Sequence, residues 1–142
     1  MIFIDTTFWV GDADANDDFH DSAHEVIEAI RTGRTAIALT TDFVLDETVT
    51  ILGRRGGFGS DKAARVAESV MSSPRVFTVY IDEVFMKESL ELYPQFHGRL
   101  SLTDVCSSVV MKRYAVREIY SHDKDFDLVK GVTRREKNSP AS

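Results

Sequence analysis

The chain has 142 residues, of which 43% are hydrophobic, and its formal net charge is −6. This length suits one domain, and the apolar share is enough for a real core, which argues against a disordered chain. The negative charge argues against broad electrostatic wrapping of nucleic acid, and no stretch approaches the ~18 apolar residues that a membrane span needs.

The chain carries no pattern typical of an exported protein. Its N-terminus lacks a basic region followed by a long apolar one, so we expect no signal peptide. Cys106 is the one cysteine, which excludes an internal disulfide and suits a reducing compartment. We therefore expect a cytoplasmic protein that does not associate with membranes.

Strand patterns alternate with helix patterns along the chain. In chain order we expect a strand at 2–4 and then an acidic segment at 12–21, a loop that enters a helix ending before Gly33. A strand at 36–39 follows, then a helix capped by Thr41 or Asp42, a helix capped by Ser60 and a strand at 76–81. After these we expect a helix that Asp82 caps and that ends before Pro94, a helix opening at Ser101, a strand at 119–121 and a short strand at 132–133.

This alternation predicts the α/β class. We expect three layers, α/β/α, around a central, mostly parallel sheet of four to five strands. Residues 1–137 form a single domain in this interpretation, and residues 138–142 form a frayed tail.

The helix that opens at Ser101 has the clearest pattern. Its apolar residues form one stripe, made of Leu102, Val105, Cys106, Val109 and Val110. Asp104 falls nearly opposite that stripe on a helical wheel, so we expect it to point away from the core. Ser101 and Asp104 also resemble a capping box, and a carboxylate in the first turn is favoured by the helix dipole while staying open to a cation.

Four acids stand at chemically suggestive places. Asp5 and Asp123 follow predicted strands, whereas Glu47 and Asp104 lie near the starts of predicted helices. Such positions converge on one edge of an α/β sheet, which is where open α/β folds hold ligands. Four converged carboxylates with few basic neighbours bind a hard divalent cation. The sequence therefore predicts a Mg²⁺ or Mn²⁺ site built for phosphate chemistry.

Simpler roles exist for each acid. Asp5 can end a strand or serve as the nucleophile of a haloacid-dehalogenase-type phosphatase, but that chemistry needs a second Asp two residues on, where this chain has threonine. Glu47 can be a solvated helical residue. The acidic run from Asp123 is not an EF-hand, because Leu128 and Arg134 hold the positions of the required Gly and Glu.

A basic patch surrounds the glycine-rich segment 53–59. It consists of Arg54, Arg55, Lys62 and Arg65. The patch is either a solvated surface or a place of contact with phosphates. The histidines show no zinc spacing with cysteine, and we interpret them as surface residues.

Five short motifs together resemble a PIN domain, and specifically the stand-alone VapC-type toxins of bacterial and archaeal toxin–antitoxin pairs. They are Ile2-Phe3-Ile4-Asp5-Thr6-Thr7, Leu45-Asp46-Glu47-Thr48, Leu102-Thr103-Asp104-Val105, Ser121-His122-Asp123-Lys124-Asp125-Phe126 and the closing Phe126-Asp127-Leu128-Val129-Lys130-Gly131-Val132. Each motif alone is common, but five in this order and spacing span nearly the whole chain.

The resemblance implies a metal-dependent endoribonuclease that leaves a 5′-phosphate and a 3′-hydroxyl. The family's acidic positions would fall to Asp5, Glu47, Asp104 and Asp123. Asp5 and Asp104 would be the core ligands of Mg²⁺, with Mn²⁺ as a substitute. Glu47 and Asp123 would bind directly, bind through water or orient the nucleophile. Thr7 matches the hydroxyl residue after the first acid, and Asp125 is similar to a less regular fifth acid.

The resemblance also implies partners, namely an RNA substrate, a small cognate antitoxin and a second copy of the chain in a homodimer. Two alternatives stay open within this family. One is an rRNA-processing PIN nuclease without an antitoxin. The other is a non-catalytic PIN-like module that binds RNA or protein, but such modules often lose acids, and this chain keeps four.

Overall fold

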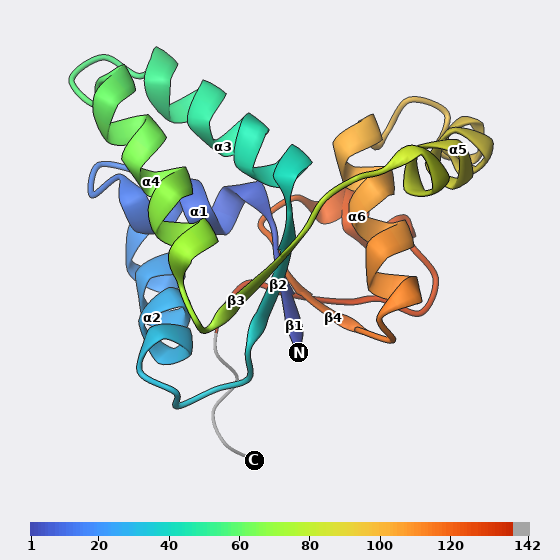
Figure 1. Ribbon diagram of the computed structural model, residues 1–142, viewed down its shortest axis with the longest axis horizontal. Helices are drawn as coiled ribbons and strands as arrows, with labels where there is room; N and C mark the ends of the chain where they lie inside the picture. Colours follow the sequence, from blue (N-terminus) through green and yellow to red (C-terminus); the bar gives the residue numbers. More distant parts are fainter. Residues whose placement is uncertain (138–142) are drawn as a thin grey trace.

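The computed structural model describes residues 1–137, so the predicted tail at 138–142 lies outside the described residues. A single sheet has the strand order β3-β2-β1-β4-β5 (Figure 1). Its strands are β1 (Ile2–Ile4), β2 (Ala38–Thr41), β3 (Val76–Val79), β4 (Glu118–Tyr120) and β5 (Thr133–Arg135). Every neighbouring pair is parallel, and the predicted fold class is confirmed.

Helices cover both faces of this sheet. They are α1 (Thr6–Ala13), α2 (His20–Arg31), α3 (Asp42–Arg54), α4 (Ser60–Ser72), α5 (Glu83–Leu92) and α6 (Leu102–Arg113), with short 3-10 helices η1 (Tyr93–Phe96) and η2 (Lys124–Leu128). Figure 1 shows α1, α2 and α4 on one side of the sheet and α5 and α6 on the other, which gives three layers. Within residues 1–137, none of the helices combines the length and apolarity of a membrane span.

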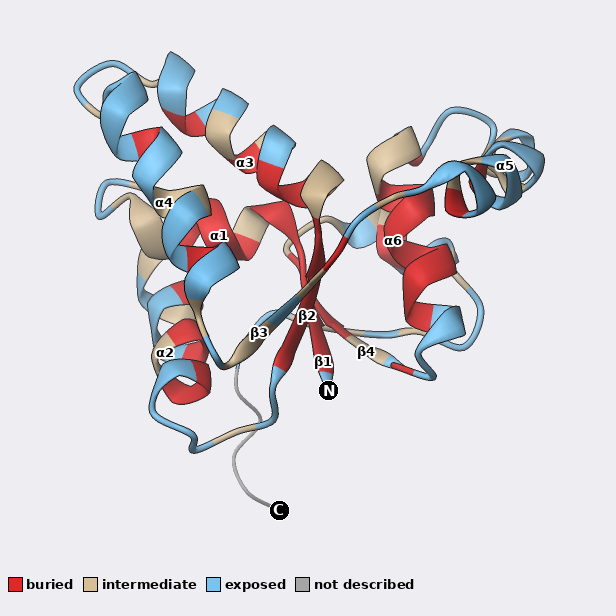
Figure 2. Ribbon diagram, viewed as in Figure 1, coloured by how far each residue is buried: buried red, intermediate tan, exposed pale blue. Residues whose placement is uncertain are grey.

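The central strands form the middle of the core. Phe3 and Ile4 of β1 are fully buried, as is Leu39 of β2 and Ile119 of β4. Continuous apolar runs of this kind are typical of parallel strands that are covered on both faces. Figure 2 shows the buried residues gathered on β1, β2 and α6, while the outer faces of α4 and α5 are exposed.

The strand order creates a topological switch point between β1 and β4. The chain passes from β1 outwards to β2 and β3, and then crosses to β4 and β5 on the other side of β1. The segments that leave β1 and β4 therefore diverge at the carboxyl edge of the sheet, and this divergence opens the place where α/β folds hold ligands. Asp5 and Asp123 follow these two strands.

Helix α1 is absent from the elements predicted from the sequence, and it extends to Ala13, into the predicted acidic loop at 12–21. That loop enters α2 at His20, as expected for a loop that leads into a helix. Helix α1 gives no amphipathic signal, since most of its residues are buried. Gly11 explains how closely α1 packs on α2: a Cβ at this position would stand 2.9 Å from the Cβ of Ala23. Only a residue without a side chain fits this contact.

Strand β2 lies two residues later than the predicted 36–39. It includes two buried threonines whose hydroxyls are satisfied inside the fold. Thr40 Oγ1 donates to the carbonyl of Ile4 at 3.1 Å and accepts from Trp9 Nε1 at 3.2 Å. Thr41 Oγ1 accepts from the backbone N–H of Val44 at 3.1 Å and caps α3, as the sequence predicted.

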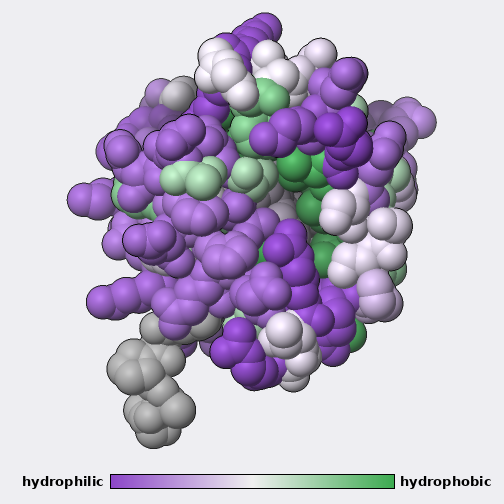
Figure 3. Space-filling model, turned by 90° about the vertical axis from the view of Figure 1, so that its left-hand side faces the viewer, coloured by the Kyte–Doolittle hydropathy of each residue, from purple (hydrophilic) through white to green (hydrophobic). Residues whose placement is uncertain are grey.

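The helical layer on the α2 and α4 side does not close completely over the core. A hollow of about 230 Å³ opens there, and apolar residues of α1, α2, α4 and β3 line it, among them Trp9, Ile27 and Val70. In Figure 3, which views this side of the molecule, apolar side chains lie in a hollow surrounded by hydrophilic ones.

Candidate active site

Asp5 lies at the carboxyl end of β1 and is 2% exposed. Its Oδ2 accepts a hydrogen bond from Ser121 Oγ at 2.7 Å and a long one from Thr7 Oγ1 at 3.5 Å. Its Oδ1 is buried and has no hydrogen-bond partner within residues 1–137. A buried carboxylate oxygen without a partner is unfavourable, so this position favours either a proton or a cation.

The electrostatics of Asp5 agree with that geometry. Burial raises its pKa from 3.8 to about 7, and the hydrogen bond from Ser121 acts in the opposite direction. The negative charges of Asp104 and Glu47 raise this pKa further. Asp5, Asp104 and Glu47 are therefore close enough to interact, although they are far apart in the sequence.

Asp104 belongs to the same acidic cluster. Burial raises its pKa to about 6, against the hydrogen bonds from Ser101, and the charges of Glu47 and Asp123 raise it as well. The two pKa shifts connect Asp5, Glu47, Asp104 and Asp123 into one cluster (hereafter the acidic cluster). Within residues 1–137, none of these four acids forms an ion pair with Lys or Arg.

The N-terminus of α6 holds Asp104 in place. The predicted capping box is present: Ser101 Oγ accepts from the Asp104 N–H at 3.1 Å, and the Ser101 N–H donates to Asp104 Oδ2 at 3.1 Å. The predicted exposure of Asp104 is wrong, because this residue is 8% exposed. Helix α6 is buried almost all round, so the side opposite its apolar stripe does not face open solvent.

The turn after β4 contains a residue that sequence reasoning missed. Besides donating to Asp5, Ser121 Oγ accepts from the Asp123 N–H at 3.0 Å. One hydroxyl therefore connects the acids that follow β1 and β4. The available signal was a hydroxyl residue at a strand end, two positions before an acid.

Two further contacts fix this turn. The His122 N–H donates to Thr7 Oγ1 at 3.0 Å, which gives the predicted supporting residue Thr7 a place between the two strands. The ring of His122 lies between those of Phe8 and Phe19, with centroids 4.6 and 4.0 Å away. Burial lowers the pKa of His122. The interpretation of His122 as a plain surface residue is therefore wrong.

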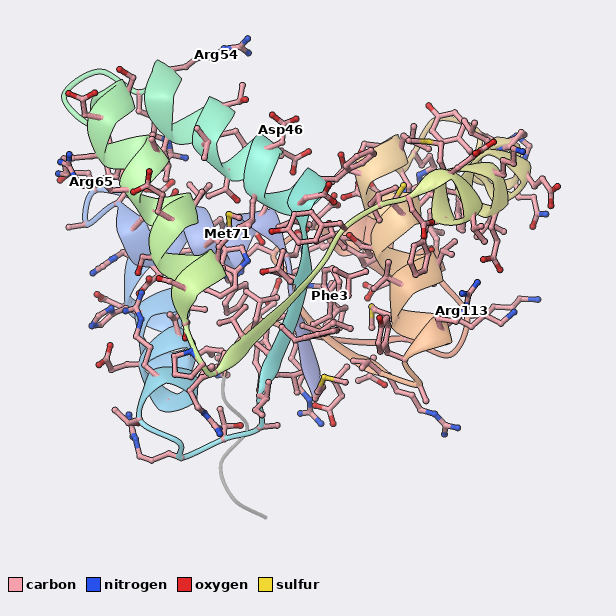
Figure 4. The ribbon with its side chains drawn as sticks, viewed as in Figure 1. Phe3, Asp46, Arg54, Arg65, Met71 and Arg113 are labelled. Atoms are coloured by element: carbon pink, nitrogen blue, oxygen red, sulfur yellow. The ribbon has the colours of Figure 1, made fainter. Side chains whose placement is uncertain are left out.

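Helix α3 supplies the remaining acid. Glu47 is half-buried, and its charge acts on both Asp5 and Asp104. The neighbouring Asp46 is exposed, and Figure 4 shows its side chain on the outer side of α3. The two adjacent acids thus offer a matched pair for mutagenesis.

Other candidate residues lie outside the acidic cluster. Asp125 forms an ion pair with Arg99 at 3.0 Å. Arg55 is bound to Asp14 and Asp17, at 2.8 Å each, and so serves as a structural link.

The rest of the basic patch lies on α3 and α4. Lys62 stands over the ring of Phe58 at 4.7 Å. Figure 4 shows Arg54 at the end of α3 that lies far from the sheet, and Arg65 on the outer side of α4. The patch is therefore separated from the acidic cluster along the length of α3.

The described residues, 1–137, contain no group of three or more His, Cys, Asp or Glu side chains already arranged around one point as metal ligands. What they do contain is a set of hard oxygen donors that repel one another at the switch point of a parallel sheet. Carboxylate oxygens are the protein ligands that Mg²⁺ and Mn²⁺ prefer.

An α/β/α fold with acids at its switch point defines a class of candidate hydrolases of phosphate esters. Residues 2–132 match the PIN domain, and the chain therefore belongs to the PIN domain family. This confirms the resemblance seen in the five motifs.

Known relatives agree with this assignment. Over 127 residues the chain is 29% identical to the 23S rRNA-specific endonuclease VapC20 of Mycobacterium tuberculosis, covering 89% of this chain and 92% of that protein. The crystal structure of Mycobacterium tuberculosis VapC20, a sarcin-ricin loop cleaving toxin, matches with a TM-score of 0.76 at 26% identity over 90% of this chain and 94% of that one. VapBC2 from Rickettsia felis, bound to a DNA fragment from their promoter, matches with a TM-score of 0.67 at 12% identity over 95% and 98%, which shows the fold alone.

Proposed function

We propose that this protein is a metal-dependent endoribonuclease, the toxin of a toxin–antitoxin pair. The observation that carries the proposal is the buried Asp5, whose Oδ1 has no partner within residues 1–137 and whose neighbours in the acidic cluster raise its pKa. Membership of the PIN domain family and similarity to an rRNA endonuclease support the reaction class.

The acidic cluster fits a divalent cation. We infer that Asp5 and Asp104 hold Mg²⁺, or Mn²⁺ as a substitute, and that Glu47 and Asp123 bind it directly or through water. Such a cation would give Asp5 Oδ1 the partner that it lacks and would offset the repulsion among the four acids. A bound divalent cation activates water and stabilises charge on a phosphate.

The residues of the chain supply position and orientation. Ser121 and Thr7 hold one oxygen of Asp5, which leaves the other free. Ser101 holds one oxygen of Asp104 in the capping box. Glu47 is half-buried and suited to orient the water that attacks the scissile phosphate.

Cleavage of RNA in the presence of Mg²⁺, with and without EDTA, tests the proposal. Asp5→Asn and Asp104→Asn are nearly isosteric and remove ligand charge, so each should reduce cleavage by about 100-fold or more while the circular dichroism spectrum stays unchanged. Asp46→Asn removes an exposed acid beside Glu47 and serves as the control, which should keep full activity. Undiminished, EDTA-resistant cleavage by either site variant would reject the metal mechanism.

We further propose RNA as the substrate, with 23S rRNA as the first to assay because the relative described above is specific for it. The proposed regulator is a small cognate antitoxin. An acidic cluster without ion pairs to Lys or Arg in residues 1–137 offers a place for an Arg or Lys of an inhibitor.

Expression of the chain alone should arrest growth, and co-expression with the adjacent reading frame should relieve the arrest. A housekeeping rRNA-processing nuclease would do neither. We also expect a homodimer, and purification from the native operon as a lone, active monomer would contradict both the antitoxin and the dimer.

A further inference from the structure

A second hollow of the described structure does not lie over the acidic cluster. It is a groove of about 960 Å³ between the α5–η1 segment, α6 and the connection from η2 to β5 (hereafter the α6 groove). Its apolar lining includes Leu92, Phe96 and Val129. Its polar rim carries two glutamates and four Lys or Arg residues, namely Glu88, Glu91, Arg99, Lys112, Arg117 and Lys130.

One face of α6 carries residues of both the α6 groove and the acidic cluster. Asp104, Ser108 and Lys112 are four residues apart in turn, so their side chains lie on the same face of the helix. Ser108 and Lys112 line the groove, and Asp104 belongs to the acidic cluster. The rise from Asp104 to Lys112 is ~12 Å, which corresponds to about three or four nucleotides of a stacked strand at ~3.4 Å each.

A second connection joins the groove to the acidic cluster. Arg99 of the rim binds the Asp125 carboxylate at 3.0 Å. The backbone N–H of Asp125 in turn donates to Asp123 Oδ1 at 2.9 Å. One end of the groove therefore lies beside the acids.

The charge of the groove is opposite to that of the whole molecule. The chain carries −6, but cations outnumber anions on this rim. Glu88 is already bound to Arg113 at 3.2 Å. Lys112, Arg117 and Lys130 are exposed, and within residues 1–137 they form no ion pair. Three cations are thus available to a polyanion at this surface.

We propose that the α6 groove binds the single-stranded segment of RNA that flanks the scissile phosphate. This inference rests on the proposed endoribonuclease function and assigns the path of its substrate. Phosphates lie against Lys112, Arg117 and Lys130, and bases lie on the apolar floor, where the half-buried Phe96 offers a ring for stacking. A basic groove combined with an aromatic side chain is the usual way in which proteins hold single strands.

The test is the triple variant Lys112→Gln/Arg117→Gln/Lys130→Gln, made in the wild type for cleavage and in Asp5→Asn for binding. The probe is a fluorescently labelled single-stranded oligoribonucleotide. We expect binding at low salt to weaken about tenfold or more, and the slope of log Kd against log salt to fall by about two, because three phosphate contacts are lost. In cleavage, KM should rise while kcat at saturating RNA stays close to that of the wild type.

The charge-matched comparison is Arg54→Gln/Lys62→Gln/Arg65→Gln, which neutralises the rival basic patch on α3 and α4. It should keep the wild-type salt slope. All six residues are exposed, so both variants should fold. Equal losses in the two variants would indicate general charge attraction and overturn the inference.

The remaining outcomes distinguish a failure of the groove inference from a failure of the proposed function. If the wild type cleaves RNA and the groove variant keeps its KM and salt slope, the groove inference fails and the proposed function stands. If the wild type neither binds nor cleaves any RNA, the proposed function fails, and the groove inference, which rests on it, fails as well. A groove variant that keeps its RNA affinity but no longer binds the antitoxin would assign the groove to an acidic protein segment and overturn the RNA path.

Discussion

Asp5 is the residue whose ionisation is most affected by the fold. Its pKa is about 7 in the folded protein, against 3.8 for the free side chain. An acid whose folded pKa is raised stabilises the fold below about pH 4, and this contribution is lost as the pH rises through about 7. This difference between the folded and free pKa of Asp5 corresponds to a contribution on the order of 4 kcal/mol to the free energy of unfolding. The metal-free protein should therefore lose stability between these two pH values.

Chemical unfolding in EDTA, at a series of pH values from about 4 to about 8, measures this effect. The control is Asp5→Asn, which cannot ionise and should show a flatter profile with higher stability at neutral pH. Asp46→Asn should follow the wild type, because Asp46 is exposed on the outer side of α3. Parallel profiles for wild type and Asp5→Asn would mean that Asp5 ionises without a cost from its surroundings.

Ser121 is the residue whose removal should affect two acids at once. In Ser121→Ala, the Oδ2 of Asp5 loses its short hydrogen bond and the Asp123 N–H loses its acceptor. Since Asp5 and Ser121 are buried, we expect a loss of about 1–3 kcal/mol in the free energy of unfolding, together with weaker Mn²⁺ binding.

Thermal melts and Mn²⁺ titrations of Ser121→Ala and Ser121→Thr distinguish a lost hydroxyl from a general packing defect. Threonine keeps the hydroxyl and suits a strand end, so it should recover Mn²⁺ binding even if the added methyl lowers stability. If alanine binds Mn²⁺ as tightly as the wild type, Ser121 does not position the acids.

At the scale of the elements, Arg55 joins two connections that are far apart in the sequence. It follows α3 and binds Asp14 and Asp17 of the segment between α1 and α2. Its guanidinium also lowers the pKa of Asp14. Because the Arg55 side chain is 35% exposed, solvent screening limits the expected loss in Arg55→Ala to about 1 kcal/mol.

Urea unfolding and RNA binding, measured on the same Arg55→Ala protein, separate structure from substrate contact. We expect lower stability with unchanged RNA affinity, and Arg55→Lys should recover only part of the stability because lysine lacks the forked guanidinium. A large drop in RNA affinity without a change in stability would restore the sequence-based prediction that Arg55 contacts phosphate.

Helix α6 illustrates what a local pattern can and cannot reveal. Its start was predictable because Ser101 and Asp104 form a capping box, which depends on residues three apart. The burial of Asp104 was not predictable from the apolar stripe, because it depends on the elements that pack on the other side of the helix. The same reason applies to α1, because most of its residues are buried and its apolar residues therefore show no helical period.

For the whole molecule, the sequence predicts the parallel sheet and the order of all strands and long helices except α1, since apolar runs, periodicity and caps are local signals. That the four acids lie near one another stays a prediction from the sequence, because strand ends and the helix starts that follow them share one edge of a sheet. The role of Ser121 as a bridge between two acids could not be predicted from the sequence, because its partners follow another strand and lie in the next turn. The α6 groove could not be predicted from the sequence either, because its lining comes from separate segments that only the tertiary structure brings together.

The acidic cluster also links the stability of the whole molecule to metal binding. Carboxylates about 4 Å apart repel by roughly 4 kcal/mol per pair at an effective dielectric near 20, before screening. The unfolded chain escapes this repulsion, so folding the metal-free protein carries a cost that bound Mg²⁺ or Mn²⁺ offsets. Binding to the folded state alone stabilises it by about 2.7 kcal/mol at 100 times the Kd, which corresponds to a rise of roughly 10 °C in Tm.

Thermal melts with and without Mn²⁺ measure this linkage directly. The wild type should melt at a higher temperature as the Mn²⁺ concentration rises. Asp5→Asn should melt higher than the wild type without metal, since one repelling charge is gone, and should respond less to Mn²⁺. The same midpoint in both proteins, with no response to Mn²⁺ in either, would mean that Asp5, Glu47, Asp104 and Asp123 do not form one site, and the proposed nuclease mechanism would then lose its basis.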